Sequence, residues 1–217
     1  MSDKYRTILN EGMAEIIEKK SRFISYAKPV KTDEEAREFI EQIKKQNWDA
    51  THNVFAYQVG DKNEIQRFSD DGEPQGTAGM PVLTVLTGEE IKNTVIVVTR
   101  YFGGTLLGTG GLVRAYGKAA KEAVLAAGIA EIESFERYSV KCSYSLSGKV
   151  QYEILQGNYI IEDTVFMEDV EYIVLVPDEK AGSFESTITD VSGAKAKITH
   201  IESVRGAFVK GKLEICQ

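Results

Sequence analysis

Two glycine-rich polar segments hold most of the side chains that could bind a ligand or carry a reaction. The first covers residues 69–79 and the second covers residues 103–111, and 10 of the chain's 19 glycines lie between residues 68 and 117. Glycine loses more conformational freedom on folding than any other residue, so a cluster needs a local reason, such as a positive φ or a close backbone approach. We expect the two segments to form one site.

The second segment lies between a buried strand predicted at residues 94–99 and a helix predicted from Leu112 to Ala127. A helix N-terminus exposes unpaired amides and a partial positive charge, which suits an anion. The known phosphate motifs do not fit, because Ala119 replaces the Ser or Thr of a Walker A loop and the dinucleotide motif lacks its third glycine. The segment therefore predicts either an anion site or a tight packing turn.

Arg114 falls in the first turn of that helix, where a cation opposes the helix dipole by about 0.3–1 kcal/mol. A bound phosphate or carboxylate, shared with Arg100 at the strand end, would offset this unfavourable term. An internal ion pair with Asp70, Asp71 or Glu73 would also offset it, and both interpretations stay open. The candidate anion or nucleic-acid binding residues are Arg100, Gly103, Gly104, Thr105, Gly108, Thr109, Gly110, Gly111 and Arg114.

The first segment holds three carboxylates within four residues, at Asp70, Asp71 and Glu73. Such a group could hold a divalent cation or supply a general acid and base. Asp-Asp-Gly and Glu-Pro are also ordinary turn sequences, and the spacing is not that of an EF-hand. We therefore expect no metal and no cofactor. The polar residues expected to face the site are His52, Asp70, Asp71, Glu73, Gln75 and Thr77.

The sequence contains no signature of covalent or zinc chemistry. There is no Gly-x-Ser-x-Gly elbow, and neither Cys142 nor Cys216 has a recognisable His partner. His52 and His200 have no Cys or His beside them that would complete a zinc site. No catalytic residue can be named, and the sequence favours a protein that is not an enzyme.

Composition and charge are those of a soluble globular protein, with 42% hydrophobic residues and a net charge of −7. The negative balance counts against nucleic-acid binding by bulk charge, while a local basic groove stays open. No apolar run approaches ~18 residues, and the N-terminus has no signal-peptide core. We expect a cytoplasmic protein with reduced cysteines and no membrane association, and no oligomeric state is predicted.

An α+β fold in two domains is predicted. In the first domain, strands are expected at residues 14–20, 23–30, 54–59, 64–68, 94–99 and 129–132. Three helices are expected: one that begins at a capping box formed by Thr32 and Glu35, one from Pro81 to Gly88, and one at residues 112–127. The pattern of predicted strands and helices starts again at residues 134–137, so the expected domains are residues 1–135 and residues 136–217. The second domain follows the order β-α-β-β-α-β, which is ferredoxin-like, with its last strand at residues 195–202 or extended to Val209.

Three stretches of the sequence resemble the IMPACT family: ATHNVFAYQVG, FSDDGEPQGTAGMPVL and VVTRYFGGTLLGTGGLVRAYGKA. The family pattern includes Gly79, the run Arg100-Tyr101-Phe102-Gly103-Gly104, and Gly108, and all of these are present. The resemblance implies a first domain similar to the second domain of a ribosomal protein and to domain four of elongation factor G. It implies a ferredoxin-like second domain similar to domains three and five of that factor.

Eukaryotic relatives of this family regulate translation under stress, largely through an extra N-terminal domain that is not expected in this sequence. The resemblance therefore implies only an association with translation, through RNA, the ribosome or a protein partner. The favoured hypothesis is a non-enzymatic module that binds RNA or the ribosome. Two alternatives stay open: an enzyme acting on a phosphorylated or acidic small molecule, and a protein-binding scaffold.

Overall fold

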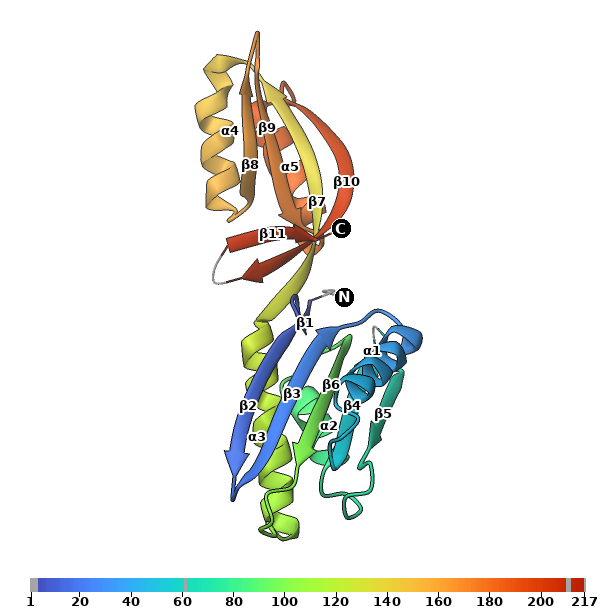
Figure 1. The fold of residues 1–217 in the computed structure, drawn as a ribbon. Coiled ribbons are helices and arrows are strands. Elements are labelled where there is room, and N and C mark those ends of the chain that lie inside the picture. The colour runs from blue at the N-terminus through green and yellow to red at the C-terminus, as the bar shows by residue number, and fades with distance from the viewer. Residues whose placement is uncertain (1–3, 61, 210–211, 217) are drawn as a thin grey trace. The chain divides into compact units, whose positions relative to one another are not determined.

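The computed structural model describes residues 4–60, 62–209 and 212–216. The chain folds into two compact α+β units (Figure 1). The first comprises residues 5–131, and the second comprises Lys4 and the described residues from Ile132 onward. The expected boundary between residues 135 and 136 falls inside a strand, as described below. No helix in the described ranges is both long and apolar enough to cross a bilayer.

The first unit is an antiparallel sheet with helices on both faces. Its strands run in the order β2-β3-β6-β4-β5, and β6 pairs with β3 on one side and β4 on the other. This confirms the prediction of a central strand. The elements are β1 (Tyr5–Ile8), β2 (Gly12–Glu18), β3 (Ser21–Pro29), α1 (Asp33–Gln46), β4 (His52–Val59), β5 (Ile65–Ser69), α2 (Gly79–Gly88), β6 (Thr94–Tyr101) and α3 (Thr109–Ala127).

The two faces of this sheet bury separate apolar cores. Val95 and Val97 of β6 pack with α1, whereas Ile96 and Val98 pack with α2 and α3. This alternation follows from the period-2 geometry of a strand and explains why β6 is apolar throughout.

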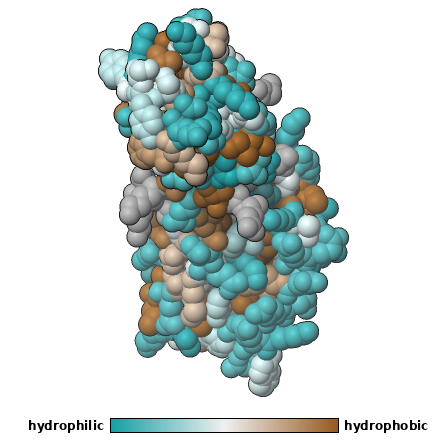
Figure 2. Space-filling view, turned by 90° about the horizontal axis from the view of Figure 1, so that it is seen from above, coloured by the Kyte–Doolittle hydropathy of each residue, from teal (hydrophilic) through white to brown (hydrophobic). Residues whose placement is uncertain are grey.

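The molecular surface is shown from above in Figure 2. Hydrophilic residues cover most of this view, with hydrophobic residues showing between them.

Helix α1 begins where the sequence predicted it. The amide of Glu35 donates to Thr32 Oγ1 at 3.1 Å, and the Glu35 carboxylate accepts from the amide of Lys31 at 2.6 Å. The capping residues therefore satisfy two amides that the helix leaves free. The predicted apolar face is also confirmed, because Ala36, Phe39, Ile40 and Ile43 are buried.

The second unit is ferredoxin-like, as predicted. Its sheet order is β11-β10-β7-β9-β8, and helices α4 and α5 connect the strands in the order β-α-β-β-α-β before a final hairpin strand. The elements are β7 (Ile129–Cys142), α4 (Tyr144–Gln156), β8 (Ile160–Phe166), β9 (Val170–Pro177), a short 3-10 turn η1 (Asp178–Lys180), α5 (Ala181–Ser192), β10 (Lys197–Val209) and β11 (Lys212–Cys216).

Four elements differ from the sequence-based expectation. Residues 134–137 are not a break, because β7 runs without interruption and contains neither Gly nor Pro to stop it. The four-residue strand β1 and the terminal strand β11 were not expected. Helix α2 begins at Gly79 instead of Pro81, which occupies its third position.

Candidate functional site

Arg100 lies inside the first unit, with 5% of its surface exposed. Its Nη1 donates to Glu73 Oε1 at 2.5 Å, and its Nη2 donates to Ser21 Oγ at 3.3 Å. The rings of Phe23 and Phe102 lie 5.4 and 5.5 Å from the guanidinium. The sequence analysis considered an internal ion pair between Arg114 and one of three acidic residues. In the structure it is Arg100 that makes such an ion pair, with Glu73.

Glu73 is the centre of a buried polar group that we call the Glu73 cluster, consisting of His52, Glu73, Arg100 and Tyr116. The hydroxyl of Tyr116 donates to Glu73 Oε1 at 2.8 Å, and His52 Nε2 lies 3.8 Å from the same oxygen. Burial, together with the charge of Glu73, raises the pKa of Tyr116, so its hydroxyl stays protonated at neutral pH. The cluster joins the first glycine-rich segment to β4, β6 and α3.

Tyr116 was missed by the sequence analysis, although a signal was present. It falls on the apolar face of α3 together with Leu112, Ala115 and Ala119, all of which are buried. A tyrosine on such a face must bury its hydroxyl and therefore needs a polar partner. The partner is 43 residues away in sequence, so no local pattern could identify it.

Asp70 holds the first glycine-rich segment in place. Its carboxylate accepts from the amides of Gly76, Ala78 and Gly79 at 2.8, 3.1 and 2.8 Å. The last two amides lie at the start of α2, whose N-cap residue Ala78 offers no side-chain acceptor. Asp70 therefore acts as a remote cap for α2 and satisfies the partial positive charge there.

Replacing Asp70 with Ala is expected to lower the free energy of unfolding by about 1–2 kcal/mol, the usual effect of losing a helix cap. Denaturant titration of the full chain would measure this loss. Asp70→Asn keeps one carbonyl acceptor and should lose less than Asp70→Ala. Equal losses for the two variants would mean that the amide contacts do not stabilise α2.

The other polar residues of this segment are mostly used by the protein itself. Asp71 accepts from the amide of Asn53 at 2.6 Å through its carboxylate, and its carbonyl lies 2.7 Å from His52 Nδ1. The Thr77 hydroxyl donates to the carbonyl of Pro74 at 2.6 Å. Among the candidate residues of this segment, only the exposed Gln75 makes no hydrogen bond within the described ranges.

Two glycines of the second segment have a clear structural reason. A Cβ on Gly103 would lie 2.0 Å from the carbonyl oxygen of Lys20, so the chain passes directly against the turn between β2 and β3. Gly108, the N-cap of α3, has a φ of +73°. The exposed Gly104 and Thr105 lie between them. The glycine count alone is therefore no argument for a ligand.

The start of α3 has the features that suit an anion. No side chain of the described residues caps it, which leaves the amides of Thr109, Gly110 and Gly111 without a side-chain acceptor in this part of the chain. Arg114 is exposed and has no ion pair with any described residue. Its Nη1 lies 3.7 Å from where a Cβ of Gly110 would stand, so the guanidinium lies over the first turn.

Apolar side chains are exposed beside this helix start. Leu106 is 81% exposed, and Phe102 and Val113 are about half exposed. We call this region the α3 surface; it consists of Phe102, Leu106, Thr109, Gly110, Gly111, Val113 and Arg114. The two predicted arginines therefore differ in exposure, because Arg114 is exposed on this surface whereas Arg100 is buried in the Glu73 cluster, with its guanidinium 5.5 Å from the Phe102 ring.

Within residues 4–60, 62–209 and 212–216, no group of three or more His, Cys, Asp or Glu residues is arranged to hold a metal ion. Cys142 is a buried free thiol, and burial raises its pKa. His200 lies in the second unit, where its ring is paired with the carboxylate of Glu136.

Comparison with known proteins gives consistent matches along the chain. Residues 19–124 match the Impact N-terminal domain, and residues 140–195 match a domain of unknown function, DUF1949. The chain is 40% identical to the IMPACT family member YvyE of Bacillus subtilis, over 91% of each chain. It is 34% identical to the IMPACT family member YigZ of Escherichia coli, over 85% of this chain and 91% of that one.

A solved structure of a hypothetical protein shares the fold. It is 31% identical in sequence, the match covers 93% of this chain and 98% of that chain, and the TM-score is 0.58.

Proposed function

The chain belongs to the IMPACT family, and from this membership we propose that it is a non-enzymatic, translation-associated protein of the cytoplasm that binds RNA through the α3 surface. The family resemblance supports the link with translation, and the α3 surface supplies a place where RNA could bind. The observation that carries the proposal is the start of α3, where no described side chain caps the helix and the guanidinium of Arg114 lies over the first turn without an ion pair to any described residue.

A phosphate group is the ligand that this arrangement suits best. Amides at a helix start and a guanidinium both donate to phosphate oxygens, and bonds to ionised groups are stronger than neutral ones. Exposed aromatic and apolar groups such as Phe102 and Leu106 offer contact for unpaired bases. Because the chain carries a net charge of −7, binding of this kind depends on a local cation and not on bulk charge.

The carboxylates of the first segment favour binding over catalysis. Asp70 and Asp71 accept backbone amides, and Glu73 accepts from Arg100 and Tyr116. A general base must be able to reach the proton of a substrate. All three carboxylates are used to hold the loop and the core.

Replacing Arg114 with Ala is expected to weaken binding of single-stranded RNA by about tenfold, because a charge-assisted bond contributes about 1.5–3 kcal/mol. The slope of log K against log salt should also fall by about 0.7, the value for one lost phosphate contact. Fluorescence anisotropy at several salt concentrations measures both quantities. Lys118→Ala, one turn further along α3 and also exposed, is the matched control.

Equal effects of Arg114→Ala and Lys118→Ala would contradict a localised phosphate contact. Absence of RNA binding by the unmodified chain at low salt would contradict the proposed function itself. Pull-down with and without ribonuclease separates this function from a protein scaffold, because a protein partner would stay bound after the RNA is removed.

A further inference from the structure

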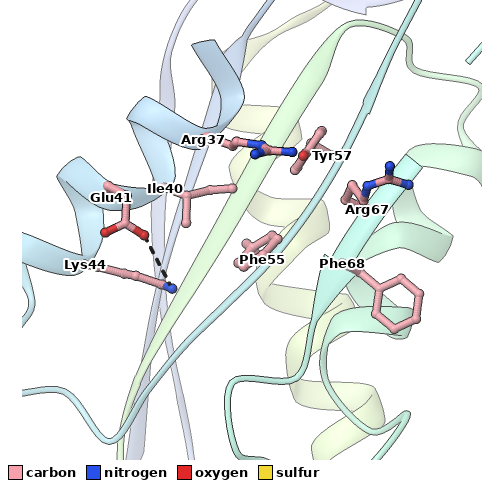
Figure 3. Close-up of a pocket in the computed structure, with 8 residues that line it drawn as sticks. All are labelled: Arg37, Ile40, Glu41, Lys44, Phe55, Tyr57, Arg67 and Phe68. Carbon is pink, nitrogen blue, oxygen red and sulfur yellow. Dashed lines mark ion pairs between the residues drawn. The ribbon is translucent and has the colours of Figure 1, made fainter. Parts of the chain in front are cut away.

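A groove lies on the opposite face of the first sheet from α3, between α1 and the edge strand β5 (Figure 3). Helix α1 packs over β4 and β6, and β5 lies beyond it at the edge of the sheet. The groove encloses about 380 Å³, within the ~300–1,000 Å³ that is usual for small-molecule sites. It is lined by Arg37, Ile40, Glu41, Lys44, Phe55, Tyr57, Arg67 and Phe68.

The floor of the groove is aromatic. Phe55 and Tyr57 project from β4 toward α1, with ring centroids 6.3 Å apart and planes inclined by 23°. Ile40 of α1 faces them across the groove (Figure 3). Tyr57 and Ile40 are only 2% and 3% exposed, so the half-buried Phe55 is the ring that a planar ligand group can reach. Aromatic faces favour offset stacking with such a group.

Two guanidiniums flank Tyr57 at one end of the groove. Arg37 reaches toward Tyr57 from α1, and Arg67 stands on β5 at the position paired with Tyr57 (Figure 3). Arg37 is fixed by an ion pair with Asp33 at 2.7 Å, and Asp33 also accepts from the Tyr57 hydroxyl at 2.5 Å. Arg67 donates to the carbonyl of Gln66 and has no carboxylate partner in the described ranges.

The other end of the groove carries one more cation. Lys44 Nζ lies 5.6 Å from the centre of the Phe55 ring and 3.7 Å from the carboxylate of Glu41. The lining therefore contains three cations and one acid, with Asp33 as a second acid beside Arg37, in a chain whose net charge is −7. The net charge of the groove is therefore positive, opposite to that of the whole chain. A positively charged groove with an aromatic floor suits a ligand that is both planar and anionic.

We propose that this groove binds a free nucleoside phosphate. The base lies at the half-buried Phe55 ring, beside the Lys44 ammonium, and the phosphate accepts from Arg37 and Arg67. Both guanidiniums lie at the Tyr57 end of the groove, one on each side of that residue (Figure 3). This arrangement suits a single phosphate better than the repeated phosphates of an RNA strand. The proposal does not depend on RNA binding at the α3 surface.

The test is calorimetric titration of the full chain with adenosine monophosphate, and with adenosine and inorganic phosphate separately. Arg67→Glu should weaken binding of the monophosphate by about tenfold or more, because it removes a charge-assisted bond. Arg67 is exposed, so the variant should fold. Phe55→Ala should weaken binding of both the nucleotide and adenosine. Lys45→Glu, a charge reversal on α1 outside the groove, is the matched control.

Selective loss with Arg67→Glu, with no change for Lys45→Glu or Arg114→Ala, would support the proposal. No saturable binding of the monophosphate, or equal loss with Lys45→Glu, would overturn it. An RNA oligonucleotide that needs Arg67 while the monophosphate does not bind would also overturn it, by assigning the groove to a strand. Because Arg114→Ala reports on the α3 surface alone, either proposal can fail without the other.

Discussion

Replacing Glu73 with Ala is expected to lower the free energy of unfolding by about 3–5 kcal/mol. The change leaves Arg100, which is 95% buried, with a charge that no carboxylate offsets, and it also removes the acceptor of the Tyr116 hydroxyl. Removing one partner of a buried pair costs more than the pair contributes, because the remaining charge has lost both water and its counter-ion. Denaturant titration monitored by circular dichroism measures the loss.

Two further variants make this result interpretable. Glu38→Ala removes an exposed carboxylate from α1 and should change stability by no more than about 0.5 kcal/mol. The combined change Glu73→Leu with Arg100→Met removes both charges and should destabilise less than Glu73→Ala alone, because no unpaired charge remains. A double variant that loses more than the single one would show that Arg100 is stabilised by groups other than Glu73.

Replacing Gly103 with Ala is expected to cost about 3 kcal/mol, the upper end of the usual effect of overpacking. The new Cβ would stand 2.0 Å from the carbonyl oxygen of Lys20 and 2.5 Å from the amide nitrogen of Ser21. Both are backbone atoms at the turn between β2 and β3, so relief requires one of the two chains to move. Thermal or denaturant unfolding of the full chain measures the change.

Gly110→Ala is the matched control for this substitution. Gly110 lies in the first turn of α3, and the nearest atom to its added Cβ is Arg114 Nη1, at 3.7 Å. Alanine has the higher helix propensity, so stability should stay the same or rise by up to about 1 kcal/mol. Comparable losses for both variants would indicate that this segment requires glycine for flexibility and not for close packing at Gly103.

The fold could be predicted wherever local sequence determines structure. Thr32 and Glu35 begin α1, and the β-branched residues 94–99 form a strand that is buried on both faces. The short β1 and the terminal hairpin of β10 and β11 could not be predicted, because their stability depends on pairing with other strands. The predicted boundary at residues 134–137 lies inside β7, and the two units divide between residues 131 and 132 of the same strand.

The candidate site could be predicted only in outline. Sequence spacing identified both glycine-rich segments and both arginines, but it could not decide which arginine faces inward. Arg100 is buried because it follows six buried residues of the central strand, and its partner Glu73 is 27 residues away. The groove between α1 and β5 was missed altogether, because Arg37, Phe55 and Arg67 come together only in the folded sheet.

The Glu73 cluster also limits how this sequence can evolve. Glu73, Arg100 and Tyr116 come from three separate elements, yet one carboxylate oxygen serves the other two side chains. A single substitution of Glu73 or Arg100 leaves an unmatched charge in the interior, whereas without Tyr116 the carboxylate of Glu73 still accepts from Arg100. We therefore expect the acid and the base to be kept together, or to be exchanged together for aliphatic residues. Neighbouring exposed positions such as Gln75 and Thr105 are free of this constraint.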